Sequence, residues 1–371
     1  MRFPPFDLER YFARHEFSAR HLLCVSDCET LSLGELLGLE PGALQELLGL
    51  RLGYTESAGH SALRAGIAAG YAGINASETL VFSGAEEAIL AFSLAVLAPD
   101  AHVVVQTPCY QSLRTAPEAA GCRVTAWPGR PENGWLPELE ALPALIRPDT
   151  RAVIVNFPHN PTGALPDRDW FQALLDIVRG HDLLLFSDEV YRGLEYAPED
   201  RLPAACELYE KAVSLGVMSK AYGLAGLRIG WVATRDRDLL RAMAGFKDYT
   251  TICNSAPSEF LATLALRHAG QLLERNRAIV TGNLTLAEAF FARQSERLAW
   301  TLPKAGPVAF PQLRAGSATA FCAEVLRTQG VLLAPGPLFG GEDASFRLGL
   351  GRSDFADGLA RLEACLADTD V

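Results

Sequence analysis

Short runs of apolar residues alternate with stretches of helical character through the middle of the chain. The helical stretches include Glu86–Leu97 and Pro166–Val178. Runs that are apolar on both faces are typical of a mostly parallel sheet with helices on each side, so we predict an α/β domain. The runs expected to form strands are Thr79–Ser83, His102–Gln106, Val124–Trp127, Arg151–Asn156, Leu183–Phe186, Ala212–Val217 and Ile229–Thr234.

The pattern changes towards residue 250, and longer helices then alternate with shorter strands. This change predicts a second, smaller α+β domain. We expect an N-terminal segment (1–45) that packs on the small domain or on a partner subunit, a large domain (46–255) and a small C-terminal domain (256–371). The later helices are expected at Ser258–His268, Leu272–Gln294, Ala318–Arg327 and Phe355–Ala367, and the strands at Trp300–Leu302, Pro307–Phe310, Val331–Leu333 and Phe346–Leu348.

Composition and charge exclude several classes of protein. Of the 371 residues, 49% are hydrophobic and 21% charged, as in soluble globular proteins, which excludes a disordered, fibrous or coiled-coil chain. A net charge of −11 argues against a nucleic-acid or anionic-membrane binder. No apolar run is long enough to span a membrane, and the start lacks a signal peptide's apolar core. The scattered cysteines and histidines show no metal-site spacing, so we expect a cytoplasmic protein with reduced thiols and no metal.

Polar residues follow two of the apolar runs, at the strand ends where open α/β sheets bind their ligands. Asn160 begins the tetrapeptide Asn-Pro-Thr-Gly after the run 151–156, and Asp188 stands in Ser-Asp-Glu-Val-Tyr (187–191) after the run 183–186. A carboxylate in that position is buried and needs a cation or several donors. Taken alone, each segment is also consistent with a βα turn or a helix cap.

Two further segments stand at the ends of apolar runs. Lys220 lies directly after the run 212–217 in a glycine-rich segment, and a desolvated lysine has a lowered pKa and a nucleophilic amine. Gly84 joins a strand to a helix, where backbone N–H groups are suited to a phosphate. A solvated lysine and an ordinary glycine turn are the structural alternatives.

In this order and spacing, the four segments resemble the fold-type I pyridoxal-phosphate (PLP) enzymes, specifically the class I/II aminotransferases. The resemblance extends from about Tyr54 to Arg347, and the lysine segment SKAYGLAGLRIG is similar to that of the histidinol-phosphate aminotransferase branch. It implies the PLP-dependent transferase fold, in which a large domain contains a mostly parallel seven-stranded sheet flanked by helices and a smaller α+β domain follows. It also implies PLP as the cofactor.

The resemblance implies catalytic roles for Lys220, Asp188 and Tyr191. Lys220 would form the Schiff base with the PLP aldehyde and then act as general acid and base, for which its amine must be neutral. Asp188 would keep the pyridine nitrogen of PLP protonated, so that the ring accepts the electrons of a carbanion. Tyr191 and Asn160 would hydrogen-bond the phenolic oxygen of the ring, and Asn160 would also contact the substrate carboxylate.

The resemblance also implies a phosphate site. Arg228 would be the fixed counter-ion of the phosphate dianion, with Ser219 as a further donor. The backbone N–H groups of Gly84 and Ala85 would add donors, and Glu86 belongs to the same cofactor-binding junction. Serine or threonine stands three residues before the lysine in many relatives, whereas Val217 stands there in this chain, so Ser219 and Arg228 are expected to do more of the phosphate binding.

Three more residues match family positions. Tyr110 would stack on the PLP ring, and Arg347 would bind the substrate α-carboxylate as a bidentate fork. Tyr54 would reach the phosphate of the neighbouring subunit, which implies a homodimer with shared active sites. The glycine segment that lines the substrate pocket in many relatives is replaced by residues 26–38.

The predicted function is PLP-dependent aminotransfer between an amino acid and a 2-oxo acid by way of pyridoxamine phosphate. A PLP-dependent lyase, cyclase or oxidase is the open alternative, because the same residues generate the same carbanion. The aminotransferase-like half of a transcription regulator is disfavoured, since no basic recognition helix precedes Tyr54. We expect small-molecule partners only, with no nucleic acid and no membrane.

Overall fold

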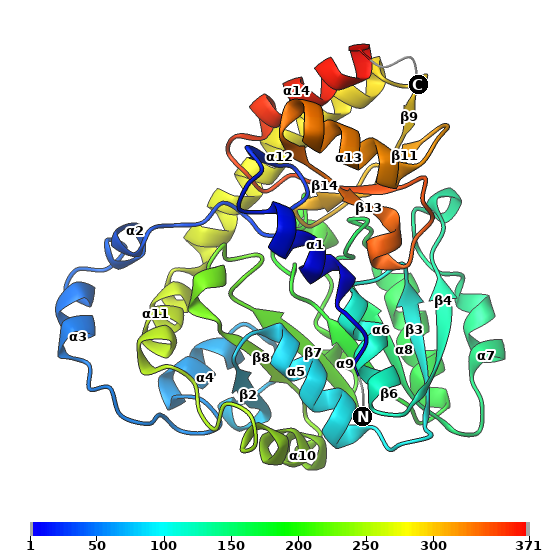
Figure 1. The fold of residues 1–371 in the computed structure, drawn as a ribbon. Helices are drawn as coiled ribbons and strands as arrows, with labels where there is room; N and C mark the ends of the chain where they lie inside the picture. Colours follow the sequence, from blue (N-terminus) through cyan, green and yellow to red (C-terminus); the bar gives the residue numbers. More distant parts are fainter. Residues whose placement is uncertain (1–2, 369–371) are drawn as a thin grey trace.

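The centre of the molecule is a seven-stranded sheet, as the computed structural model, which describes residues 3–368, shows (Figure 1). The strands lie in the order β2-β8-β7-β6-β5-β3-β4, and only β8 runs antiparallel to its neighbours. This confirms the predicted mostly parallel sheet and brings the carboxyl ends of β5, β6 and β7 side by side. The strands are β2 (Thr79–Phe82), β3 (His102–Thr107), β4 (Arg123–Pro128), β5 (Thr150–Asn156), β6 (Leu184–Asp188), β7 (Ala212–Val217) and β8 (Gly230–Ala233).

Helices cover both faces of the sheet, which is why its strands are apolar on both faces. Val103 and Val105 of β3 pack with Phe92 on one face, whereas Val104 packs with Leu174 on the other. This alternation follows from the two-residue period of a strand. The helices of this part are α4 (Ser61–Ala68), α5 (Ala85–Ala91), α6 (Gln111–Ala119), α7 (Leu142–Leu145), α8 (Arg168–Gly180), α9 (Ala205–Leu208), α10 (Arg237–Lys247) and α11 (Ala256–Arg267).

Several predicted helices differ from the observed ones by a few residues at their ends, and two of these differences have a local cause. The stretch 86–97 is α-helical only as far as Ala91, and Phe92–Val96 (η2) forms a π-helical turn. The helix expected from Pro166 begins instead at Arg168, because the side chain of Asp167 accepts a hydrogen bond from the N–H of Trp170 at 2.8 Å. An N-cap of this kind fixes the residue at which a helix starts.

A smaller α+β part lies above the sheet in Figure 1, as predicted. It holds a three-stranded antiparallel sheet and two strand pairs. The strand predicted at Trp300–Leu302 is wrong, because pairing ends at Ala299 and the Trp300 ring stacks on Phe291, with centroids 4.3 Å apart. The elements are α12 (Ala269–Arg293), β9 (Leu298–Ala299), β10 (Val308–Ala309), β11 (Gln312–Leu313), α13 (Ala318–Gln329), β12 (Val331–Leu332), β13 (Ala334–Pro335), β14 (Phe346–Gly349) and α14 (Phe355–Asp368).

The N-terminal segment joins the two parts of the molecule. Its elements are α1 (Asp7–His15), β1 (His21–Leu22), α2 (Leu33–Leu37) and α3 (Ala43–Gly49). β1 pairs in parallel with β12, and the Tyr11 hydroxyl donates to the Leu333 carbonyl at 2.7 Å. At its other end, α1 reaches the sheet-bearing part, where the Asp7 N–H donates to Gln111 at 2.9 Å. Figure 1 shows α1 crossing between the two parts, while α2 and α3 extend to one side.

Candidate active site

A cavity of about 430 Å³ opens at the carboxyl ends of β5, β6 and β7. The strand ends, the start of α5 and the N-terminal segment contribute to its walls. The sequence placed candidate residues at these strand ends, and the fold brings most of them to one cavity. Predicted residues in its lining are Ala85, Glu86, Tyr110, Asn160, Asp188, Ser219, Lys220 and Arg228.

Lys220 projects into this cavity from the segment after β7. Its Nζ donates to the Ser26 hydroxyl at 2.8 Å. Loss of bulk water lowers the pKa of Lys220, while the carboxylate of Asp27 acts in the opposite direction. A buried amine with a lowered pKa is the form in which a lysine acts as a nucleophile or a base.

Asp188 ends β6 and is 4% exposed. One of its carboxylate oxygens accepts the backbone N–H of Val190 at 3.1 Å. Burial raises the pKa of Asp188 to about 7, although the nearby Lys220 lowers it. A carboxylate that has left water with so few donors is stabilised by a cationic partner, and the cavity is where such a partner would lie.

Asn160, Tyr191 and Arg347 meet beside the cavity. Arg347 is fully buried; its Nη1 donates to Oδ1 of Asn160 at 3.0 Å, and its Nε donates to the carbonyl of Cys24 at 2.8 Å. Its Nη2 and the Tyr191 hydroxyl are buried with no hydrogen-bond partner within the described chain. Buried polar atoms of this kind call for a ligand or water to satisfy them.

The junction before α5 forms a tight cradle with Arg228. Gly84 has a φ of +90°, and a Cβ at this position would lie 2.4 Å from Nη2 of Arg228. Nη1 of Arg228 donates to the Ser219 hydroxyl at 3.3 Å. No side chain caps the start of α5, so its first N–H groups remain available to an anion. Val217 lines the same region and adds no hydroxyl.

Glu86 and Tyr110 also face the cavity, each with a hydrogen bond to a neighbouring residue. The Ser112 hydroxyl donates to Glu86 at 2.9 Å, and burial raises the pKa of Glu86 to about 7 even though the side chain keeps surface within the cavity. The Tyr110 hydroxyl donates to Glu9 of α1 at 3.3 Å. This last contact ties a predicted ring-stacking residue to a segment that sequence reasoning left without a role.

Sequence reasoning missed two groups of residues. The first is Asn156 at the end of β5, which accepts the N–H of Asn160 at 2.7 Å and donates to the carbonyl of Asp188 at 2.8 Å. Asn156 is a polar residue at the end of an apolar run, which is the pattern that identified Asp188. The sequence could therefore have predicted a role for Asn156. The second group comes from the N-terminal segment and comprises Leu8, Glu9, Phe12, Glu16, Val25, Ser26 and Asp27.

Tyr54 is the one predicted cofactor residue far from these contacts. Its side chain is 91% exposed, and it is absent from the residues that line the cavity. Its expected role concerns a neighbouring subunit and stays a prediction.

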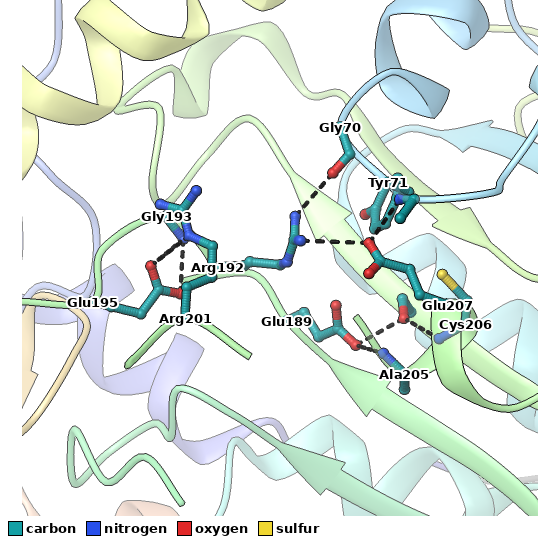
Figure 2. A network of polar contacts seen from close by, with 12 residues as sticks. Gly70, Tyr71, Glu189, Arg192, Gly193, Glu195, Arg201, Ala205, Cys206 and Glu207 are labelled. Carbon is teal, nitrogen blue, oxygen red and sulfur yellow. Dashed lines mark hydrogen bonds and ion pairs between the residues drawn. The ribbon is translucent and has the colours of Figure 1, made fainter. Parts of the chain in front are cut away.

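A second polar network is formed around Glu189 and Arg192, in the turn that follows β6 (Figure 2). Glu189 accepts from the Ser214 hydroxyl at 2.7 Å and from the N–H of Ala205 at 2.9 Å. Arg192 lies 3.5 Å from Glu207 and donates to the Gly70 carbonyl at 3.1 Å. These contacts tie the turn after β6 to α4 and α9, and so hold the strand that presents Asp188.

The arrangement fits the PLP that the sequence resemblance implies. The cavity offers a desolvated amine, a buried carboxylate short of donors and a cradle with an arginine at a helix start. These groups match, in turn, an aldehyde, a pyridinium nitrogen and a phosphate. The unpartnered Nη2 of Arg347 matches a substrate carboxylate.

Comparison with known proteins gives the same result. The profile of the family described as aminotransferase class I and II matches residues 30–355. Capreomycidine synthase of Streptomyces vinaceus is 34% identical over 97% of this chain and 93% of its own length. The crystal structure of a PLP-dependent aminotransferase from Streptococcus suis superposes with a TM-score of 0.93 at 32% identity, covering 100% of both chains. That of the PLP-dependent cyclase OrfR has a TM-score of 0.91 at 33% identity, covering 99% of this chain and 98% of its own.

Proposed function

We propose a catalytic role for the residues of the cavity. The premise is that the chain belongs to the aminotransferase class I and II family and is a PLP-dependent aminotransferase of fold type I. Lys220, Asp188 and Tyr191 perform its chemistry, and the reaction exchanges the amino group of an amino acid with a 2-oxo acid. The observation that supports these roles is the meeting of Lys220 and Asp188 in one cavity. The unsatisfied Nη2 of the neighbouring Arg347 supplies the site for a substrate carboxylate.

When bound, PLP supplies an aldehyde that condenses with amines and a pyridinium ring that accepts electrons from Cα of the substrate. Arg228 and Ser219, with the N–H groups at the start of α5, would hold the phosphate. Asp188 would hold a proton on the ring nitrogen, and a positive charge there would favour the ionised form of its carboxylate. Lys220, whose pKa is lowered by burial, would take the proton from Cα of the substrate at its Nζ.

Two residues orient the substrate for that proton transfer. Arg347 binds the α-carboxylate through Nη2, which has no partner in the described chain. Asn160 holds Arg347 in place through its Oδ1 and itself lines the cavity. The hydroxyl of Tyr191, also without a partner, is free to donate to the phenolic oxygen of the ring.

A half-reaction tests this function. Adding a reactive amino acid to the PLP-loaded enzyme, with no 2-oxo acid present, should shift the visible absorbance of the cofactor and release one equivalent of the matching 2-oxo acid. Lys220→Ala should abolish both changes. An enzyme that consumes amino acids without forming any 2-oxo acid would rule out transamination.

Cyclisation is a second candidate, because one of the two structural neighbours above is described as a PLP-dependent cyclase. The same residues would remove the same proton, and the outcome would then depend on which group attacks next. Product analysis separates the two candidates. A cyclised amino acid formed without a 2-oxo acid acceptor favours cyclisation, and an equivalent of 2-oxo acid favours transamination.

Exposed apolar residues support a homodimer with shared active sites. Leu44, Leu48 and Leu52 are 47%, 76% and 84% exposed, and Tyr54 follows them. An apolar stretch of this kind is stabilised by a second copy of the chain. In that dimer Tyr54 reaches the phosphate site of the partner. The molar mass measured by light scattering checks the dimer directly.

A reducing compartment such as the cytoplasm is the proposed location. Cys24, Cys28 and Cys109 are buried thiols, and burial raises their pKa well above the ordinary value. Buried thiols of this kind are typical of proteins kept reduced. Within residues 3–368, no helix combines the length and apolar character that a membrane crossing requires.

A further inference from the structure

We propose that this enzyme takes amino acids with a positively charged side chain, and that Glu9 and Glu16 at the ends of α1 select that charge. The inference rests on the proposed function, because it uses the same cavity and the same carboxylate anchor. It assigns a role to α1, the first helix of the N-terminal segment.

The position of α1 supplies the first argument. Glu9, Phe12 and Glu16 line the cavity, and their spacing of three and four residues places them on one face of the helix. The guanidinium carbon of Arg347 lies 5.9 Å from the centre of the Phe12 ring. Glu9 and Glu16 each lie about one helical turn from Phe12, in opposite directions along α1. A substrate whose α-carboxylate binds Arg347 therefore lies near both glutamate side chains.

The charges of the cavity supply the second argument. Asp27 already has an ion-pair partner, because Arg352 donates to both of its carboxylate oxygens at 2.9 and 3.1 Å. Glu9 receives only the Tyr110 hydroxyl, and within residues 3–368 neither Glu9 nor Glu16 has a cationic partner within 4.0 Å. Two carboxylates therefore face the cavity without a counter-ion.

The carboxylates act on each other, which agrees with their closeness. Burial raises the pKa of Glu16, and the negative charges of Asp27 and Glu9 raise it further, while the more weakly acting positive charges of Arg352 and Lys220 lower it. A cation placed between Glu9 and Glu16 relieves this repulsion, whereas an acidic side chain increases it.

The other ionised groups at the site already have partners or assigned ligands. Arg228 faces the phosphate and Arg347 the α-carboxylate, while Asp188 faces the ring nitrogen. Glu86 accepts a hydrogen bond from Ser112, and burial raises its pKa, so it holds its proton more tightly than an ordinary carboxyl group. The charge left to recognise the substrate side chain is therefore negative. The rings and methyl groups of Phe12 and Leu8 suit the methylene stem of a long cationic side chain.

The test compares two amino acids that differ in charge but hardly in shape, L-arginine and L-citrulline. Binding to the PLP-loaded enzyme is measured by calorimetry, and kcat/KM is measured in the half-reaction. We expect L-arginine to bind at least about 10-fold more tightly than L-citrulline, as a charge-assisted hydrogen bond would give. Glu9→Gln and Glu16→Gln should each weaken L-arginine binding by roughly 10-fold and leave L-citrulline nearly unchanged. Glu288→Gln, on an exposed face of α12, is the matched control and should change neither.

The outcomes separate this inference from the proposed function. Equal binding of the two amino acids by the wild-type enzyme overturns the inference, whatever the variants do. Preferred binding of L-arginine without release of a 2-oxo acid supports the inference and counts against transamination. Transamination of neutral amino acids, with no preference for cationic ones, supports the proposed function and overturns the inference. Because the wild-type comparison needs no substitution, a variant that fails to fold does not weaken the test.

Discussion

Arg347 and Asn160 stand 187 positions apart, and their side chains meet beside the cavity through an Nη1–Oδ1 hydrogen bond of 3.0 Å. The bond joins β14 of the small part to the turn after β5 in the central sheet. It leaves Nη2 of Arg347 free for a second acceptor. Arg347 therefore links the two parts of the molecule and also offers one unpaired N–H group to a substrate carboxylate.

Replacing Arg347 should therefore damage substrate binding more than cofactor binding. Arg347→Lys keeps the charge but loses the fork, so kcat/KM should fall roughly 10- to 100-fold, mostly through KM. The visible spectrum of the PLP-loaded enzyme should be unchanged without substrate. Arg361→Lys, at an exposed position in α14, is the control and should behave like the wild type. A loss of cofactor absorbance instead would place Arg347 in the cofactor site.

The raised pKa of Asp188 makes the stability of the PLP-free protein depend on pH. Its folded-state pKa of about 7 lies above the ordinary value of 3.8, so the folded state holds this proton more tightly. The contribution of Asp188 is therefore most favourable at low pH, and is lost as the pH rises from about 4 through about 7. Asp188→Asn should raise the unfolding free energy by roughly 1–4 kcal/mol at pH 8, and the gain should vanish near pH 4.

Thermal melts of PLP-free protein across this pH range measure that difference. Asp200→Asn, at an exposed position, should show no such trend. PLP should remove the effect from the wild type, since a cationic ring nitrogen lowers the pKa of Asp188. Stability that rises with pH in the PLP-free wild type, relative to Asp188→Asn, would contradict the assignment.

The cradle between Gly84 and Arg228 should not tolerate a side chain. In Gly84→Ala the new Cβ would meet Nη2 of Arg228 at 2.4 Å, at a φ of +90° that alanine rarely adopts. We expect the PLP dissociation constant to rise at least about 10-fold and stability to fall by about 1–3 kcal/mol. Gly282→Ala in α12 has open space around it and should be neutral or slightly stabilising. Unchanged PLP affinity in Gly84→Ala would show that the phosphate lies elsewhere.

Shared active sites predict complementation between two inactive proteins. In a mixed dimer of Lys220→Ala and Tyr54→Ala protomers, one of the two sites combines an intact Lys220 with an intact Tyr54 from the other protomer. Co-expressed protomers with different tags should therefore yield mixed dimers with clear activity, at most about half that of the wild type. Each parent assayed alone is the reference. Mixed dimers no more active than the Tyr54→Ala parent would show that Tyr54 does not act across the interface.

The sequence predicted site residues correctly where a polar side chain follows an apolar run. Asp188 and Lys220 each follow an apolar run, and the parallel sheet then brings such strand ends together, so their meeting was predictable. Glu16 offers no such signal, because a carboxylate at the end of a surface-like helix is ordinary. Its place in the cavity depends on how α1 crosses the molecule, which is a matter of contacts between distant residues. Ser26 illustrates this, since its partner Lys220 lies 194 positions away.

The attachment of α1 to both parts of the molecule has a mechanical consequence. One end is held by Gln111 of the sheet-bearing part, and the Tyr11 hydroxyl is held by Leu333 of the small part. If the two parts rotate about a hinge, α1 must therefore move with one of them, or one of these two hydrogen bonds must break. Opening and shutting of the enzyme would then reposition Glu9 and Glu16 relative to Arg347, so that selection of the substrate and commitment to turnover become a single movement.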